Sequence, residues 1–245
     1  MTQDKRIPKE GDHSEAMKNQ VVKQAFTTSI PVMAGYIVLG MGFGLLLHDA
    51  GFGVGWALLM SVTIYAGTMQ YVGVSLLATA APLLTVALTT FMVQARHLFY
   101  SISMIERYKN AGKYKPYLAF ALTDETYSLL SSTVPPCPPE YANYYRFLVS
   151  LFNHSYWITG CLLGNLLGEV LPFSTKGLEF SMTALFVAAF TEQWIVLRDH
   201  IPSLTGFAGT LLCLLIFGPE HFLIPALLLI VLILTLLRSR EEALL

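Results

Sequence analysis

Apolar stretches and short polar connectors alternate along most of the chain. An α-helix needs about 20 predominantly apolar residues to cross the hydrocarbon core of a bilayer, and most of these stretches approach that length. The pattern predicts about eight such helices, at residues 26–47, 55–79, 82–105, 116–133, 145–170, 178–197, 202–218 and 221–237. We therefore expect an all-α polytopic membrane protein with a single transmembrane domain over residues 23–245, preceded by a polar cytosolic tail over residues 1–22.

The composition supports this class and excludes others. Of the 245 residues, 54% are hydrophobic and 13% are charged, and the mean hydropathy of +0.57 suits a chain immersed in lipid. The 15 Lys and Arg residues balance 16 Asp and Glu residues, so nothing favours nucleic acid as a partner. The three cysteines and six histidines lack the spacing of a metal or redox site, and no hydrolase motif is present. We expect no enzyme activity, no metal and no cofactor.

The distribution of Lys and Arg tests how the segments cross, because these residues concentrate on the cytoplasmic side of membrane proteins. If every segment crosses once, the basic residues divide poorly between the two sides. If the second and sixth segments are broken or turn back inside the membrane, nearly all of them lie on the side of the tail, and Arg146 lies alone on the other. This arrangement predicts two four-segment halves, residues 26–133 and 145–237, with inverted orientations, as in many transporters.

Glycines recur at four-residue spacing in the first and fifth segments. Small residues at this spacing let two helix backbones approach closely in a membrane, where apolar side chains gain little from leaving lipid. We favour this packing role over a ligand contact for the whole set, which comprises Gly35, Gly40, Gly42, Gly44, Gly160, Gly164 and Gly168.

Arg96 stands in the apolar stretch TTFMVQARHLFYSISM (89–104). At helical periodicity the neighbouring residues divide into an apolar face and a face that carries Arg96 with polar residues. The apolar face comprises Leu88, Phe91, Ala95, Leu98, Ile102 and Ile105, and the other face comprises Thr89, Val93, Arg96, Tyr100 and Ser103. Arg96 therefore faces protein or water, where it either forms a structural ion pair or lies on a substrate pathway. His97 points elsewhere around the helix and is a weaker candidate for proton transfer.

Two acidic residues, Asp124 and Glu125, lie in the middle of the fourth segment, in LAFALTDETYSLLSS (118–132). Either could pair with Arg96, which would leave the other acid without a cation. A carboxyl group of that kind in a low-dielectric site can bind and release protons, as proton coupling requires. The alternative is that Thr123 or Asp124 caps a break in the helix, and the two roles are compatible.

The second segment contains TIYAGTMQYVG (63–73), a cluster of small and polar residues in an otherwise apolar run. A helix break at Ala66, Gly67 and Thr68 would expose backbone N–H groups at a helix start, and such groups bind carboxylates well. Gln70 lies beside them. Together with an acid that could accept an ammonium group, this set suits a zwitterion with an apolar side chain, such as a branched-chain amino acid.

Four stretches, in this order, resemble one known family: IPVMAGYIVLGMGFGLL (30–46), LLMSVTIYAGTMQ (58–70), RHLFY (96–100) and FALTDETYSLL (120–130). They resemble the large subunit of the AzlC-type branched-chain amino acid exporters, also called the LIV-E family. The resemblance covers most of residues 23–237. It implies a multi-pass inner-membrane exporter of branched-chain or related hydrophobic amino acids, driven by the proton motive force. It also implies a partner, a small AzlD-like membrane subunit of about four helices.

The resemblance assigns substrate-binding or proton-coupling roles to the positions that match the family's motifs, which are Tyr65, Ala66, Gly67, Gln70, Arg96, His97, Tyr100, Thr123, Asp124 and Glu125. Many relatives read YAGASQF where this chain reads YAGTMQY (65–71), and the larger Met69 would narrow a pocket there. The second half matches more loosely, with NHSYW at 153–157 and with Thr183 where relatives often have proline. We expect a secondary transporter for such amino acids. The alternative is a membrane scaffold subunit whose buried charges are structural.

Overall fold

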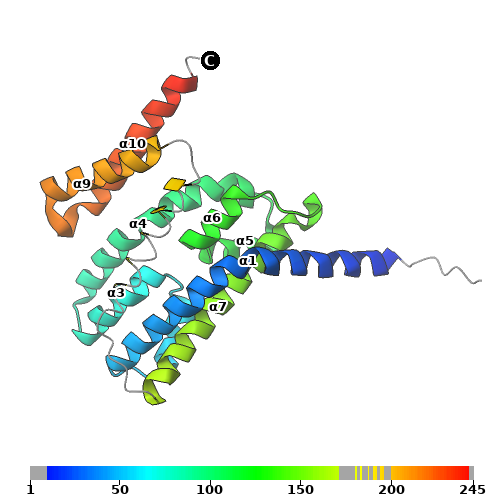
Figure 1. Cartoon of the computed structure of the whole chain (residues 1–245), viewed down its shortest axis with the longest axis horizontal. Coiled ribbons are helices and arrows are strands. Elements are labelled where there is room, and N and C mark those ends of the chain that lie inside the picture. The colour runs from blue at the N-terminus through cyan, green and yellow to red at the C-terminus, as the bar shows by residue number, and fades with distance from the viewer. Residues whose placement is uncertain are drawn as a thin grey trace, which may run out of the picture. The chain divides into compact units, whose positions relative to one another are not determined.

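The structure, a computed structural model, describes residues 10–170 and 200–242 and the single positions 180, 183, 187, 190, 191, 194 and 195. Every regular element in these residues is helical, which confirms the all-α class (Figure 1). The sixth predicted segment, with Lys176 and Arg198 beside it, lies mostly outside the described residues. The chain forms two compact units: unit 1 is Met1–Gln70 with Phe99–Thr175, and unit 2 is Tyr71–Leu98 with Lys176–Leu245.

Two of the predicted segments are each divided into a pair of helices. The described helices are α1 (Glu10–Asp49), α2 (Val54–Thr63), α3 (Gly67–Ala78), α4 (Leu83–Tyr108), α5 (Lys115–Phe120), α6 (Asp124–Ser132), α7 (Ala142–Val170), α9 (Ile201–His221) and α10 (Leu223–Glu242), with short 3₁₀ turns η1 (Gly112–Tyr114) and η2 (Pro139–Tyr141). α1 begins at Glu10, so part of the predicted polar tail is helical. The second segment forms α2 and α3, and the fourth forms α5 and α6. The first of these breaks was predicted, whereas the second corresponds to the alternative in which the fourth segment is capped internally.

α1 and α7 pack along each other with their backbones in contact (Figure 1). A Cβ atom on Gly40 would lie 2.9 Å from the backbone nitrogen of Cys161, and one on Gly160 would lie 2.7 Å from the carbonyl oxygen of Ile37. Atoms at these separations overlap, so a larger residue would force the helices apart. The predicted packing role is confirmed for Gly40, Gly44, Gly160, Gly164 and Gly168. It does not extend to Gly35, whose Cβ position has no described heavy atom of another element within 4 Å.

α1 and α7 run in the same direction. At the start of α7, Tyr145 Oη donates a hydrogen bond of 2.8 Å to Thr28 Oγ1, near the middle of α1. Near their ends, the side chain of His48 packs against Gly168. Residue numbers therefore rise together along the contact. Inverted four-segment halves would require these two helices, which begin the two halves, to be antiparallel, so this part of the predicted topology is wrong.

α5 and α6 form a hairpin that enters unit 1 at one end and returns to the same end. Arg107, at the end of α4, donates hydrogen bonds of 2.6 and 2.8 Å to the carbonyl oxygens of Leu130 and Ser131, at the end of α6. Asn143, at the start of α7, donates one of 2.8 Å to the carbonyl oxygen of Asn110, just after α4. The ends of α4 and α6 and the start of α7 therefore lie together. Because α5 follows the connector after α4, the fourth segment turns back instead of crossing.

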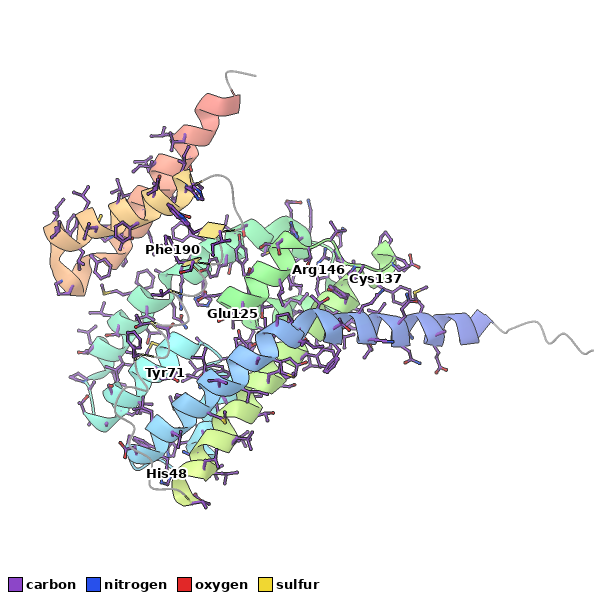
Figure 2. The ribbon with its side chains drawn as sticks, viewed as in Figure 1. His48, Tyr71, Glu125, Cys137, Arg146 and Phe190 are labelled. Carbon is purple, nitrogen blue, oxygen red and sulfur yellow. The ribbon has the colours of Figure 1, made fainter. Side chains whose placement is uncertain are left out.

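The basic side chains of unit 1, as far as the structure describes it, gather at this end. They are Lys18, Lys23, Arg107, Lys109, Lys113, Lys115 and Arg146. The first two flank Val21, which packs in the same buried cluster as Tyr145. Figure 2 shows Arg146 at this end and His48 at the other. The prediction that Arg146 lies alone on the opposite side is wrong, because it assumed that the fourth segment crosses the membrane. We call this end of unit 1 the basic end.

In unit 2, α9 and α10 pack against each other (Figure 1). The chain leaves the helical conformation at Gly218, where φ is 73° and ψ is 171°, a backbone geometry that favours glycine. A Cβ atom on Gly209 would lie 3.1 Å from the side chain of Ile230, so the two helices are close there. A groove of about 360 Å³ beside α9 is lined by Phe190, Thr191, Trp194, Ser203, Leu204 and Phe207.

Candidate functional site

The break between α2 and α3 holds a buried tyrosine in an unusual backbone conformation. The non-helical stretch covers residues 64–66, close to the predicted position, and Gly67 already begins α3. Tyr65 has a φ of 40°, in the left-handed region that bulky residues rarely occupy. Its ring stacks on His154 of α7 with 4.0 Å between the centroids. Strain of this kind costs roughly 1–3 kcal/mol and persists where the surrounding structure enforces it, often at functional sites.

The break between α5 and α6 places a carboxylate against α1. Thr123 caps α6, since its Oγ1 accepts a hydrogen bond of 3.3 Å from the backbone nitrogen of Thr126. The hydroxyl of Tyr36, on α1, lies 2.6 Å from Thr123 Oγ1 and donates a hydrogen bond of 2.7 Å to Glu125 Oε2. Figure 2 shows Glu125 on α6 beside α1. The alternative in which Thr123 caps a helix break is confirmed, and the same turn positions Glu125.

α7 contributes two side chains that anchor elements from the two breaks. Asn153 Nδ2 donates a hydrogen bond of 3.0 Å to Thr126 Oγ1, in the first turn of α6. One helical turn further on, Trp157 Nε1 donates one of 2.7 Å to Gln70 Oε1, in the first turn of α3. Asn153, Thr126 and Gln70 have no exposed surface. The first turns of α3 and α6 are therefore both held by one face of α7.

His154 bridges the same two segments. Its Nε2 lies 3.1 Å from the carbonyl oxygen of Ser61 in α2, and its Nδ1 lies 3.0 Å from the hydroxyl of Tyr117 in α5. A carbonyl oxygen can only accept a hydrogen bond, so Nε2 carries the hydrogen. In a neutral ring, Nδ1 then accepts from the Tyr117 hydroxyl. This arrangement fixes both the tautomer and the orientation of the imidazole.

Aromatic contacts join these groups into one assembly. The Tyr36 ring lies edge-on to Trp157 and to Tyr65, with centroid distances of 5.4 and 6.5 Å. We call the assembly the polar cluster; it comprises Tyr36, Ser61, Tyr65, Gln70, Tyr117, Thr123, Glu125, Thr126, Asn153, His154 and Trp157, all in unit 1. It combines an acid that can exchange a proton, hydroxyl and amide groups that can bind polar ligand atoms, and aromatic walls.

The structure brings together part of the predicted site. Tyr65, Gln70, Thr123 and Glu125 belong to the polar cluster, and Gly67 and Asp124 are the first residues of α3 and α6. Tyr100 lies outside the cluster, where its ring stacks on Tyr127 with a centroid distance of 4.6 Å. Arg96 and His97 are in unit 2, so the pairing of Arg96 with Asp124 or Glu125 stays a prediction.

The apolar face predicted around Arg96 is mostly exposed, whereas the opposite face is mixed: Ser103 is exposed, and the others, Thr89, Val93, Arg96 and Tyr100, are half-buried. Five members of the apolar face are between 56% and 64% exposed: Leu88, Phe91, Leu98, Ile102 and Ile105. Ala95 is the exception, at 6%. Large apolar side chains exposed along one helix face are typical of contact with lipid or with another membrane helix.

Several members of the polar cluster were not predicted as site residues. They are Tyr36, Ser61, Tyr117, Thr126, Asn153, His154 and Trp157. The stretch NHSYW (153–157) carried a usable signal, because three polar or amphipathic residues share one helix face within an apolar segment. Among the described residues, no three His, Cys, Asp or Glu side chains come together as metal ligands.

Two helices in the described part of the chain, Glu15–Asp49 within α1 and Ile201–Pro219 within α9, are long and apolar enough to cross a bilayer. The broken helices of unit 1 enclose a polar cluster beneath largely apolar surfaces. These features are typical of a helical membrane protein with an internal polar site.

Comparisons with known proteins point to one family. The model of the family described as AzlC protein matches residues 31–171. The chain is 39% identical over 220 residues to the branched-chain amino acid transport protein AzlC of Bacillus subtilis, covering 90% of this chain and 86% of that protein. The chain belongs to the AzlC family, which confirms the resemblance found in its motifs.

Relatives from other bacteria carry different descriptions. An uncharacterized membrane protein of Haemophilus influenzae is 40% identical over 238 residues, 96% of each chain. The inner membrane protein YgaZ of Escherichia coli is 29% identical over 166 residues, 65% of this chain and 68% of that protein. No solved structure matches the chain. The relatives are membrane proteins, in agreement with the class that the fold defines.

Proposed function

We propose that this protein transports branched-chain or related hydrophobic amino acids and that it exports them. The observation that carries the proposal is the 39% identity, over 220 residues, to a Bacillus subtilis protein described as a branched-chain amino acid transport protein. The polar cluster supports it, because a free amino acid presents both a cation and an anion that need polar partners away from water. A scaffold subunit would not need strained backbone and a half-buried carboxylate at the junction of two broken helices.

Glu125 is the group that we assign to proton coupling. Its carboxylate accepts the 2.7 Å hydrogen bond from the Tyr36 hydroxyl, and a short bond of this kind stabilises the ionised acid. When Glu125 takes up a proton, that stabilisation weakens and the hold of α6 on α1 weakens with it. Proton uptake and movement of the α5–α6 hairpin are thereby coupled. Asp124, one residue earlier, is the alternative proton carrier, with Arg96 as counter-ion or carboxylate ligand.

The basic end of unit 1 supports an orientation. Lys and Arg favour the cytoplasmic side, so the start of α1 and the end of α6 face the cytosol in the inner membrane, and the N-terminal tail is cytosolic. The family resemblance supports a second component, a small AzlD-like membrane subunit. Its docking surface would be among the exposed apolar helix faces, of which the Leu88 to Ile105 face of α4 is one.

The test is transport in proteoliposomes that contain the full chain with its small partner subunit. Labelled leucine, isoleucine, valine and methionine are followed with and without a pH gradient. We expect efflux of at least one of them to depend on the gradient. In Glu125→Gln the gradient should no longer drive transport, while exchange of internal for external leucine continues, because exchange needs no net proton movement. The matched variant Asp124→Asn should keep gradient-driven transport.

The results of this test distinguish Glu125 from Asp124 as the proton carrier, and a transporter from a scaffold. Loss of gradient-driven transport in Asp124→Asn alone would move the proton-coupling role to Asp124. Absence of transport of all four amino acids by the wild-type pair would reject the proposed function and favour the scaffold alternative.

A further inference from the structure

Two buried amides of the polar cluster are each satisfied at one end only. Gln70 accepts from Trp157 through Oε1, and Asn153 donates to Thr126 through Nδ2. The other ends, Gln70 Nε2 and Asn153 Oδ1, have no hydrogen-bond partner among the described residues, although both side chains are fully buried. A buried polar atom left in this condition costs about 1–3 kcal/mol, so each one calls for an explanation.

The chemical character of the Gln70 end is set by its neighbour. Trp157 Nε1 can only donate, so the atom of Gln70 that faces it must be the oxygen, and the remaining atom must be the NH₂ donor. Gln70 also lies in the first turn of α3, a helix of 12 residues whose N-terminus favours negative charge. The donor and the helix start together suit a carboxylate.

The Asn153 end has the opposite character. With Nδ2 donating to Thr126, its oxygen is an acceptor. Asn153 and Trp157 are four residues apart on α7, so the groups that anchor the two amides lie on one helix face, one turn apart. The cluster thus offers a donor end and an acceptor end joined through Trp157, Tyr36 and Thr123.

We propose that Gln70 and Asn153 form the polar subsite for an α-amino acid, with Gln70 Nε2 donating to the substrate carboxylate and Asn153 Oδ1 accepting from its ammonium group. This deepens the proposed function and rests on it. The site is closed in this structure, since both amides are fully buried. Substrate enters when α3 or the α5–α6 hairpin moves from α7.

The experiment measures competition for binding of tritiated leucine to the purified full-length protein. The competitors are leucic acid, in which a hydroxyl replaces the ammonium group, and leucinamide, in which an uncharged amide replaces the carboxylate. We expect wild type to bind leucine at least about tenfold more tightly than either, because a hydrogen bond to a charged group contributes about 1.5–3 kcal/mol. Gln70→Glu keeps an oxygen for Trp157 but replaces the donor, so leucinamide should become equal to leucine or better.

Asn153→Leu should weaken recognition of the ammonium group of the substrate. The preference for leucine over leucic acid should fall about tenfold, while the preference over leucinamide stays. Asn165→Leu is the matched control: Asn165 is also a fully buried α7 asparagine whose Oδ1 has no hydrogen-bond partner among the described residues, but its Nδ2 donates to the carbonyl oxygens of Gly44 and Phe52, away from the cluster. It should lower thermal stability and leave both preferences unchanged.

Unchanged preferences in the folded Gln70 and Asn153 variants, or the same change in all three variants, would overturn the subsite and leave amino-acid transport intact. If Gln70→Glu does not fold, Gln70→Met removes the donor without adding charge, and the same loss of preference over leucinamide is expected. Failure of wild type to bind or transport leucine, isoleucine, valine or methionine would instead reject the proposed function, and the subsite with it.

Discussion

The hydroxyl of Tyr36 on α1 donates a hydrogen bond of 2.7 Å to Glu125 Oε2 on α6. This bond joins two elements that are far apart in the sequence, near the tip of the α5–α6 hairpin, where Asn153 and His154 of α7 also contact Thr126 and Tyr117. It makes the ionisation state of one carboxyl group a determinant of how firmly the hairpin is held. With Glu125 as the proposed proton carrier, uptake of a proton would change the contact between α6 and α1 at this point.

Tyr36→Phe tests this bond directly. The substitution keeps the ring against Trp157 and removes the hydroxyl that contacts Thr123 and Glu125. We expect gradient-driven leucine transport to fall about tenfold or more, since a hydrogen bond to a charged group contributes about 1.5–3 kcal/mol. Initial rates in proteoliposomes measure the effect. Tyr156→Phe removes a hydroxyl that pairs with Ser29 at 3.0 Å, and its rate should stay near wild type. Equal rates for the two variants would argue against a special role for Tyr36.

The glycine contact between α1 and α7 predicts a loss of stability. In Gly160→Ala the added methyl group would lie 2.7 Å from the carbonyl oxygen of Ile37, and overpacking of this kind costs about 1–3 kcal/mol. The midpoint of thermal unfolding of the detergent-solubilised protein should fall by several degrees. Gly35→Ala in α1 is the control, because its Cβ position is open and alanine favours a helix. A midpoint for Gly160→Ala at or above that of Gly35→Ala would contradict the backbone contact.

The hydrogen bonds of Arg107 predict that this side chain anchors the end of the α5–α6 hairpin. Arg107→Ala removes two hydrogen bonds to the last carbonyl groups of α6, which would lower stability by about 0.5–1.5 kcal/mol at this exposed position and speed hydrogen exchange at the end of α6. Lys109→Ala serves as control, because Lys109 pairs with Glu106 at 3.5 Å on an exposed surface, where such pairs contribute little. Exchange rates in α6 that are the same in both variants would show that Arg107 does not hold the hairpin.

The hairpin also predicts which connectors share a side of the membrane. The connector after α4 and the loop that contains Cys137 should be accessible from one side, and the connector between α1 and α2 from the other. In whole cells, a membrane-impermeant maleimide should label Gly53→Cys and spare both Lys109→Cys and the native Cys137; inverted vesicles should give the opposite result. Burial raises the pKa of the Cys137 thiol, so its labelling should quicken as the pH rises.

Each engineered cysteine is best placed in a Cys137→Ser background, with Cys137 measured in the native chain. Labelling of Lys109→Cys and Cys137 from opposite sides would restore the arrangement in which the fourth segment crosses the membrane.

The sequence was enough to predict the structural features that depend on neighbouring residues alone. The spacing of Gly40, Gly160 and their neighbours predicts close packing because it reflects one helix face, and the small residues after Tyr65 predict a break because they weaken a helix locally. The cap at Thr123 follows from the same kind of local signal. These features need no knowledge of which helix lies beside which.

The features that sequence reasoning missed depend on contacts between distant segments. The contact of Tyr36 with Glu125 has no local signature, because either residue alone could serve many roles. The topology failed for a related reason: charge counting depends on the number of crossings, and the fourth segment was counted as a crossing although it is a hairpin of two short helices. That one error reversed the direction of α7 relative to α1.

The backbone contact between α1 and α7 limits how the protein can change shape. Sliding movements between packed helices require side chains that can shift from one rotamer to another, and here backbone meets backbone with no side chain between. The two helices must therefore move as one rigid body. In the proposed transport cycle, the alternating exposure of a substrate to the two sides falls to the broken helices, whose attachments to this pair include side-chain hydrogen bonds of the type that an amino acid can replace.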